Sequence, residues 1–198
     1  MAKRIQMTGA EFSKMVRVMR GFKSGAASST ALEARDMFYL ETGINPLNQA
    51  AAVTAYASDG RRAVKVTSNL TYVDVPLKGF MRNPPFIPRS SDTVTITLRG
   101  RTLYTTYESY GVTFASPQPS QGKDIVKNVK SAIEAAKTTA DKAEIYLNNG
   151  FMADAMKAAA VALAGRPAKV KISVGESPAP ILIEAKCMEA IILPQRGD

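Results

Sequence analysis

The side chains that most often do chemistry in proteins are scarce in this sequence. Histidine is absent, which excludes Ser-His-Asp and Cys-His catalysis, histidine-ligated zinc and the commonest general base at neutral pH. The one cysteine, Cys187, allows no intrachain disulfide and no cysteine-cluster metal site, and a lone cysteine is more often a small core residue than a nucleophile. No carboxylate pair or Asp-x-Asp spacing points to a metal. The sequence therefore predicts a protein that is not an enzyme and needs no metal or cofactor.

The charge balance points to a polyanionic partner instead. Lysine and arginine total 26 against 17 acidic residues, for a formal charge of +9. An excess of this size favours nucleic acid or an acidic membrane surface, although a merely basic soluble protein is an equal alternative on charge alone. The longest apolar stretch, residues 158–164, is too short to span a bilayer, and no apolar signal core follows residues 1–5. We therefore expect a cytoplasmic protein.

Three helical patterns position many of these cations. Residues 9–23 carry Lys14 and Arg17 on the side opposite the apolar stripe and Arg20 on its flank. That stripe consists of Phe12, Met15, Val16, Met19 and Phe22.

The second and third patterns lie in the last 80 residues, over 123–142 and 151–163. The second has an apolar stripe of Ile125, Val126, Val129, Ala132, Ile133 and Ala136, opposite Lys127, Lys130, Glu134 and Lys137. For the third, the expected inward-facing residues are Met152, Met156, Ala159, Ala160 and Leu163.

Strand patterns fill most of the rest. They cover residues 5–8, 31–41, 51–57, 63–67, 70–77, 93–98, 102–107, 110–115, 144–148, 168–174, 180–185 and 188–194, with a hairpin turn at Asp59-Gly60 and an irregular crossover at 78–91. The Pro-, Ser- and Gln-rich segment 116–122 is the best boundary, dividing the chain into units 1–118 and 119–198. We expect an α+β protein of repeated β-α-β-β-β units, with helices on one face of antiparallel sheets.

Three segments resemble the middle and C-terminal domains of the bacterial DNA polymerase III β sliding clamp family. Residues 147–158, Leu-Asn-Asn-Gly-Phe-Met-Ala-Asp-Ala-Met-Lys-Ala, are similar to the family's aromatic-Asn-x-x-aromatic pattern that continues to Asp-Ala-Leu-Lys-Ala. The strands at 170–174 and 180–183 and the ending 191–196 follow in the family's order. Residues 57–64 resemble its Ala-Thr-Asp-Gly-His-Arg-Leu-Ala, and 8–12 more loosely resemble the opening of its middle domain.

The resemblance implies a DNA-clamp fold, in which several chains close a ring and helices line a hole that holds duplex DNA. Helix-borne cations would then neutralise phosphates without reading bases, so the DNA can slide. A solvated helix face is the alternative. The cations concerned are Lys14, Arg17, Arg20, Lys23, Lys123, Lys127, Lys130 and Lys137.

The resemblance also implies a pocket that holds short apolar peptide motifs of DNA polymerases and the clamp loader. One wall matches Ser58, Gly60, Arg61, Arg62 and Ala63, and the other matches Ile191, Ile192, Leu193, Pro194, Gln195 and Arg196. The chain departs from the family at Arg61, which replaces a histidine, at Ala63, which replaces a leucine, and at Gln195, which replaces an apolar residue. The pocket is therefore expected to be shallower and more polar.

Size and rival functions complete the expectations. The chain lacks the family's first domain, its compactness favours a phage protein, and two domain-equivalents per chain favour a trimeric ring. A single-stranded DNA-binding protein is the main alternative, with Tyr104, Tyr107 and Tyr110 as a stacking platform, although cross-strand pairs on a sheet explain these residues more simply. A clamp-derived regulator or inhibitor of replication is the third reading.

Overall fold

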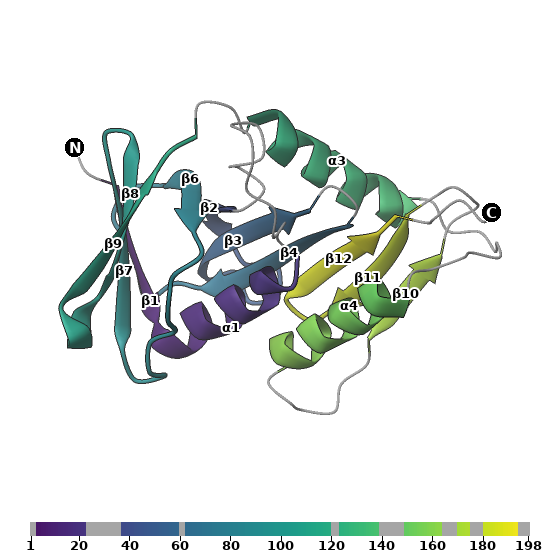
Figure 1. The fold of residues 1–198 in the computed structure, drawn as a ribbon, viewed down its shortest axis with the longest axis horizontal. Coiled ribbons are helices and arrows are strands. Elements are labelled where there is room, and N and C mark those ends of the chain that lie inside the picture. Colours follow the sequence, from purple (N-terminus) through teal and green to yellow (C-terminus); the bar gives the residue numbers. More distant parts are fainter. Residues whose placement is uncertain are drawn as a thin grey trace.

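The structure is a computed structural model that describes residues 3–22, 37–59, 62–119, 123–138, 149–163, 170–174 and 180–193. Two antiparallel sheets and three α-helices form this part of the chain (Figure 1). The α+β class expected from the sequence is confirmed. No helix among the described residues combines the length and apolarity needed to cross a membrane.

The smaller sheet has the strand order β5-β1-β7-β8-β9. Its strands are β1 (Lys3–Thr8), β5 (Tyr72–Val73), β7 (Thr93–Arg99), β8 (Thr102–Tyr107) and β9 (Val112–Pro117), with a 3-10 turn η2 (Glu108–Tyr110) before β9. The predicted meander β7-β8-β9 is confirmed. The predicted strand at 70–77 shrinks to the two residues of β5.

The larger sheet has the order β10-β11-β12-β4-β3-β2-β6 and combines strands from residues 37–82 with strands from residues 171–192. It consists of β2 (Met37–Ile44), β3 (Ala51–Ser58), β4 (Arg62–Asn69), β6 (Lys78–Arg82), β10 (Lys171–Val174), β11 (Ile181–Ala185) and β12 (Met188–Ile192). β12 pairs with β4, placing Ile191 opposite Ala63. The predicted units 1–118 and 119–198 therefore share one sheet, and their division stays a prediction.

Strand β6 corrects the sequence-based expectation of an irregular crossover over 78–91. Its five residues pair with β2, although Gly79 weakens the strand pattern. The side chain of Gln118 stabilises this strand. Its Nε2 donates to the Phe80 carbonyl at 2.8 Å, and its Oε1 accepts from the Phe80 backbone amide at 2.6 Å. Only a tertiary contact reveals this strand.

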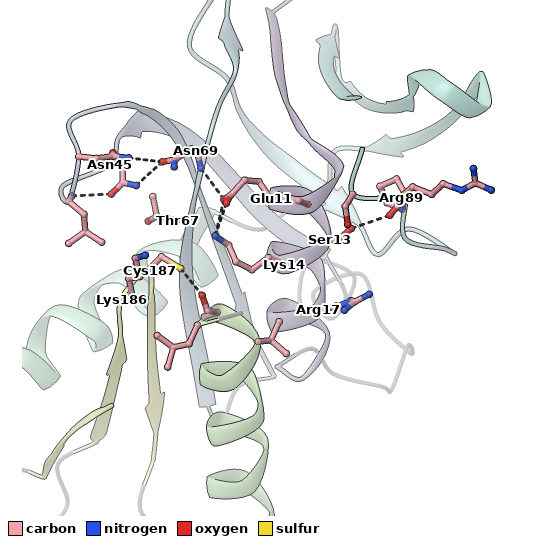
Figure 2. A pocket seen from close by; sticks show the side chains of 18 residues that line it. Glu11, Ser13, Lys14, Arg17, Asn45, Thr67, Asn69, Arg89, Lys186 and Cys187 are labelled. Atoms are coloured by element: carbon pink, nitrogen blue, oxygen red, sulfur yellow. Dashed lines mark hydrogen bonds and ion pairs between the residues drawn. The ribbon is translucent and has the colours of Figure 1, made fainter. Parts of the chain in front are cut away.

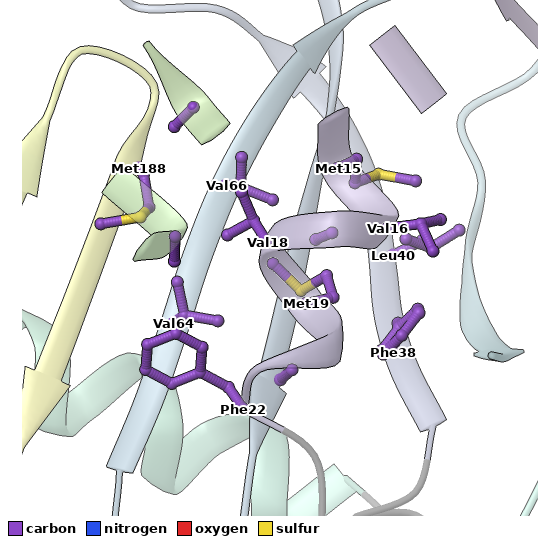
Figure 3. Close-up of a cluster of buried hydrophobic side chains, with 14 of the residues drawn as sticks. Met15, Val16, Val18, Met19, Phe22, Phe38, Leu40, Val64, Val66 and Met188 are labelled. Carbon is purple, nitrogen blue, oxygen red and sulfur yellow. The ribbon is translucent and has the colours of Figure 1, made fainter. Parts of the chain in front are cut away.

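Helix α1 (Gly9–Arg20) follows the predicted stripe. The Thr8 hydroxyl accepts a hydrogen bond from the Glu11 amide and caps the helix. All five stripe residues are fully buried, and Figure 3 shows Met15, Val16, Met19 and Phe22 among Phe38 and Leu40 of β2 and Val64 and Val66 of β4. The two predicted strands before and after the Asp59 hairpin are β3 and β4, as expected.

Helix α4 (Asn149–Ala162) packs beside α1 with a face that overlaps the predicted one only in part. Its buried residues are Ala155, Ala158, Ala159 and Ala162, whereas Met156 is 39% exposed and Ala160 is exposed. The alanines recur at helical spacing and allow the two helices to approach closely. Of the predicted inward-facing residues, Ala159 is buried and Met152 and Leu163 pack partly buried against the core, whereas the prediction was wrong for Met156 and Ala160.

Helix α3 (Lys123–Thr138) covers the opposite face of the larger sheet from α1 and α4 (Figure 1). Neighbouring residues of a strand point to opposite faces. Val64 packs in the core with α1 and α4, while Ala63 packs with Val129, Ile133 and Ala136 of α3. The expectation that the helices gather on one face therefore needs correction at α3. Of the stripe predicted for this helix, the described side chains are buried except Ala132, which is partly buried.

Candidate functional site

A basic groove lies on the side of the sheet that carries α1 and α4. It measures about 1000 Å³ and lies between α1, the end of α4, the turn between β11 and β12, and the segments around residues 45–48 and 88–90 (Figure 2). Its cations are Lys14, Arg17, Arg89 and Lys186, against one acid, Glu11. We call this set of residues the basic groove.

Glu11 and Lys14 neutralise each other at the groove wall. The Lys14 ammonium lies 3.0 and 2.9 Å from the two carboxylate oxygens of Glu11, and the Asn69 amide donates to the same carboxylate. Asn69 in turn accepts from the side-chain amide of Asn45 at 2.8 Å. This wall is consequently polar but nearly uncharged, so the attraction for an anion rests on the other cations.

Arg17 and Arg89 carry unpaired positive charge at the groove. Arg17 is exposed on the outer side of α1, and no ion pair with an acid is found for either arginine among the described residues. The loop that bears Arg89 is held against α1, because the Ser13 hydroxyl donates to the Pro88 carbonyl at 3.2 Å and the Ala10 amide donates to the Ser90 carbonyl at 3.2 Å. Both guanidinium groups project away from the helix in Figure 2.

Two further cations lie on α1 and α4 but do not line the groove. Arg20 is half-buried and donates to the Asn83 side-chain oxygen at 2.9 Å and the Pro84 carbonyl at 2.7 Å, both uncharged. Lys157 is exposed on α4 and is not among the cations predicted from the sequence. The alanine spacing at 155, 158, 159 and 162 is the signal that places Lys157 on the outer side.

The structure does not bring all the predicted cations together. Lys127 and Lys130 lie on α3, across the sheet from Lys14, Arg17 and Arg20. Lys127 is exposed, whereas Lys130 forms an ion pair with Glu41. The side chains of Lys123 and Lys137, and the whole of Lys23, lie outside the described residues.

The Lys130 ammonium rests in a small cage of acidic and aromatic groups on β2 and β3. It lies 2.7 Å from both oxygens of Glu41 and 5.1 and 5.7 Å from the ring centres of Tyr56 and Tyr39. Tyr56 also donates to Glu41 at 3.1 Å. Burial first and the Glu41 carboxylate second raise the pKa of both tyrosines, so they remain neutral hydrogen-bond donors at physiological pH.

The residues predicted to form the peptide pocket are distributed over both sheet faces. Ala63 and Ile191 are buried beneath α3, Ile192 is buried in the core with α1 and α4, and Leu193 is 40% exposed. The Ser58 hydroxyl donates to the Arg62 carbonyl across the hairpin. Gly60, Arg61, Pro194, Gln195 and Arg196 lie outside the described residues.

Arg62 has a structural role, because it holds separate elements of the fold together. It donates to Asp59 at 2.8 Å and to Asp154 of α4 at 2.6 Å, and its guanidinium carbon lies 4.6 Å from the ring centre of Phe151. Burial alone would lower the pKa of Arg62, but the bonds to the two aspartates outweigh it and raise the pKa. Arg62 thus links the two parts of the chain across the β4–β12 junction.

The three tyrosines suggested as a stacking platform do not share a surface. Tyr107 is fully buried and donates to the Phe86 carbonyl at 2.9 Å, and Tyr104 lies on the other face of β8. Tyr110 is 42% exposed and packs on Phe86. Tyr107 therefore belongs to the core, and a platform of all three is absent from the described strands.

Comparison with known proteins places the fold. No family model matches the sequence, and no curated protein matches it. Among solved structures, the chain is similar to the DNA polymerase sliding clamp from Bacillus subtilis, with a TM-score of 0.68, 13% identity and coverage of 98% of this chain and 64% of the clamp. A C. crescentus β sliding clamp gives a TM-score of 0.69, 11% identity, and coverage of 98% of this chain and 65% of that one.

A third match is the Helicobacter pylori β clamp bound to a DNA ligase peptide, with a TM-score of 0.60 at 13% identity over 98% of this chain and 67% of the clamp. The chain thus spans about two thirds of the length of these clamps. At these identities the likeness shows the fold, and the fold is that of the β sliding clamp. The described residues contain no group of three or more side chains able to hold a metal ion.

Proposed function

We propose that the chain is a sliding clamp, which encircles duplex DNA without reading its sequence, tethers replication proteins to it, and does no chemistry of its own. The observation that carries the proposal is the backbone match to β clamps along 98% of the chain. The proposal places the protein with DNA in the cytoplasm, of a bacterium or of the host of a phage.

The charge on the α1 and α4 side supports this function. Both acids that these helices contribute, Glu11 and Asp154, are paired with cations, whereas Arg17 and Lys157 are exposed and without an acidic partner among the described residues. Rigidly held cations on a helix surface attract phosphates at any sequence. In this proposal the DNA therefore lies against α1 and α4 and not against α3.

A ring requires contacts between copies, and the sheets provide candidates. β9 ends the smaller sheet and β10 ends the larger sheet, and neither has a strand partner on its outer side among the described residues. Figure 1 shows these two strands at opposite ends of the molecule. A head-to-tail contact between such edges closes a ring, and a trimer would supply about six domain-equivalents. Light scattering at micromolar concentration is expected to give three times the chain mass, and a monomer would contradict the ring.

Topology provides the decisive test of the function. A clamp loaded on closed circular duplex is retained, whereas linear duplex of the same sequence lets it slide off its ends. We expect retention on circular duplex in gel filtration, loss after a single cut by a restriction enzyme, and no preference for single strands. Equal retention on cut and closed DNA would exclude encirclement, and a preference for single strands would favour the single-strand binding alternative.

A clamp-derived regulator is the second candidate because α3 covers the face of the larger sheet opposite α1 and α4. Such a protein would bind a clamp or clamp loader without encircling DNA. The test supplies a clamp loader but no other clamp. Retention of the chain on closed circular DNA then favours the sliding clamp, and absence of retention favours the regulator.

A further inference from the structure

Helix α3 covers an apolar and partly acidic surface on the larger sheet. This surface lies on the sheet face opposite α1 and α4, and the strands form it without any residue of α3. We define the covered patch as Tyr39, Glu41, Tyr56, Ala63, Leu182 and Ile191. The two sides of this patch come from β2–β4 and from β11–β12, which are already joined through the β4–β12 pairing. The sheet can therefore keep its order whether or not α3 lies on it.

The fit between α3 and the covered patch has a simple pattern. Val126, Val129, Ile133 and Ala136 recur at three- and four-residue steps and are all buried against the sheet. Lys130 lies beside Val129 and places its ammonium in the cage of Glu41, Tyr56 and Tyr39. An occupant of this patch is thus recognised by one cation and by an apolar residue three positions later.

The described side chains of α3 bury less apolar surface against the sheet than those of α1. Among the side chains of α3 that the structure describes, the buried ones are Val126, Val129, Ile133 and Ala136, and the Lys130–Glu41 ion pair is partly exposed. α1 and Phe22 just after it bury two phenylalanines and four methionine or valine side chains completely. Burial of apolar area sets most of the strength of such contacts. Of the two helices, α3 is therefore the one that can leave its sheet face while the rest of the fold stays intact.

We propose that α3 is a built-in competitor at a partner-docking surface, and that the covered patch binds an amphipathic helical segment of a partner protein with a lysine or arginine followed three residues later by an aliphatic residue. The inference rests on the proposed function, since it concerns how partners are tethered. Two of the residues assigned by resemblance to the peptide pocket, Ala63 and Ile191, lie beneath α3. The partner gains the Glu41 cage and the apolar strip only when α3 is displaced.

A helix tethered to its own site acts at an effective concentration on the order of millimolar. A free partner peptide must exceed this competition, so the wild-type site is closed to weak partners. A partner held nearby, for example on the same DNA, competes on equal terms. Tethering would then depend on local concentration, as suits an assembly that acts only at the DNA.

The test uses a fluorescein-labelled synthetic peptide of residues 123–138 as probe and anisotropy as readout. Ile133→Asp in the full chain places a charge where the side chain is 1% exposed and should displace α3 from the patch. Ser131→Asp adds the same charge on the exposed side of α3 and is the matched control. Lys130→Ala is a milder variant that removes only the pair with Glu41.

We expect Ile133→Asp to raise the affinity for the probe at least tenfold over wild type and Ser131→Asp, with a smaller rise for Lys130→Ala. A probe carrying Lys130→Glu should bind none of the proteins, since it meets Glu41 with like charge. Circular dichroism melting shows whether each variant stays folded.

The proposal is overturned if Ile133→Asp and Lys130→Ala, both melting cooperatively, bind the probe no better than Ser131→Asp. If Ile133→Asp does not fold, the comparison of Lys130→Ala with Ser131→Asp decides alone. Retention of the wild-type protein on circular DNA is measured separately, so a failure of the clamp function is distinguished from a failure of the α3 competition.

Discussion

Arg62 on β4 and Asp154 on α4 form an ion pair of 2.6 Å between residues 92 positions apart in the chain. Asp59 holds the same guanidinium from within the hairpin, and only 11% of the Arg62 side chain is exposed. The arginine therefore ties the hairpin between β3 and β4 to α4, on the face that carries the proposed DNA surface.

Replacing Arg62 tests this link. Arg62→Ala removes two charge-assisted hydrogen bonds and the stacking on Phe151, so we expect the free energy of unfolding to fall by about 2 kcal/mol. Urea denaturation measures the change. Arg17→Ala, at an exposed position, is the control and should leave the midpoint unchanged. Equal midpoints for Arg62→Ala and wild type would assign the pair no structural role.

Gly9 is required by the loop that carries Arg89. A Cβ on Gly9 would collide with the Arg89 carbonyl oxygen, where the Gly9 amide already donates to the Asp92 carbonyl at 2.7 Å. Gly9→Ala must move the loop or α1, so we expect a loss of about 2 kcal/mol in unfolding free energy. Gly43→Ala meets nothing within 4 Å and should be close to neutral in the same denaturation series. Similar losses in both variants would mean that a general effect of glycine replacement, and not the Arg89 contact, is responsible.

The sequence predicted the elements well where one periodic pattern determined both type and face. The stripe from Phe12 to Phe22 is large, apolar and regular, and the structure buries all of it. The stripe of α3 is equally regular, but a stripe does not say which face of a sheet it meets. That choice depends on where the loops before and after the helix lead, which is a property of the whole fold.

The errors at α4 and β6 have other causes. Close helix packing favours Ala155 and Ala158 over the larger Met156, so residue size misled part of the assignment of the buried face. β6 depends on hydrogen bonds from the distant Gln118, which no local pattern contains. For the candidate site, the cations of α1 were found from the sequence, whereas Arg89 and Lys186 join them only through tertiary structure.

Asp92 should make stability depend on acidity. Its side chain is 2% exposed, and one carboxylate oxygen accepts from the Thr93 amide at 2.8 Å, the Ser109 amide at 2.9 Å and the Ser109 hydroxyl at 2.6 Å. Burial alone would raise the pKa of Asp92, but these bonds outweigh it and hold the pKa below the ordinary value of 3.8. The folded protein thus binds this proton less tightly than the unfolded chain does.

The stabilising contribution of the Asp92 carboxylate is therefore complete above pH 3.8 and is lost as the pH falls through the lower pKa of the folded state. We expect Asp92→Asn to lower the free energy of unfolding by about 1 kcal/mol at pH 7, and the gap from wild type to narrow on acidification below pH 3.8. Thermal melts at several pH values measure the gap. Asp74→Asn, at an exposed position, is the control; a gap that stays constant with pH would show that Asp92 is not the titrating group.

Charge reversal decides which side of the sheet faces the DNA. Arg17 and Lys157 are exposed on α1 and α4, and Lys127 is exposed on α3, so the three substitutions to Glu are comparable in burial and in charge change. We expect Arg17→Glu and Lys157→Glu each to weaken association with closed circular duplex. Each should also reduce the salt slope of log K by about 0.9 for every chain of the ring that loses a phosphate contact. Lys127→Glu should change neither quantity, because α3 lies across the sheet. A reduced slope for Lys127→Glu with unchanged slopes for the other two would place the DNA on the α3 side, and would mean that the covered patch faces the channel instead of the partner proteins.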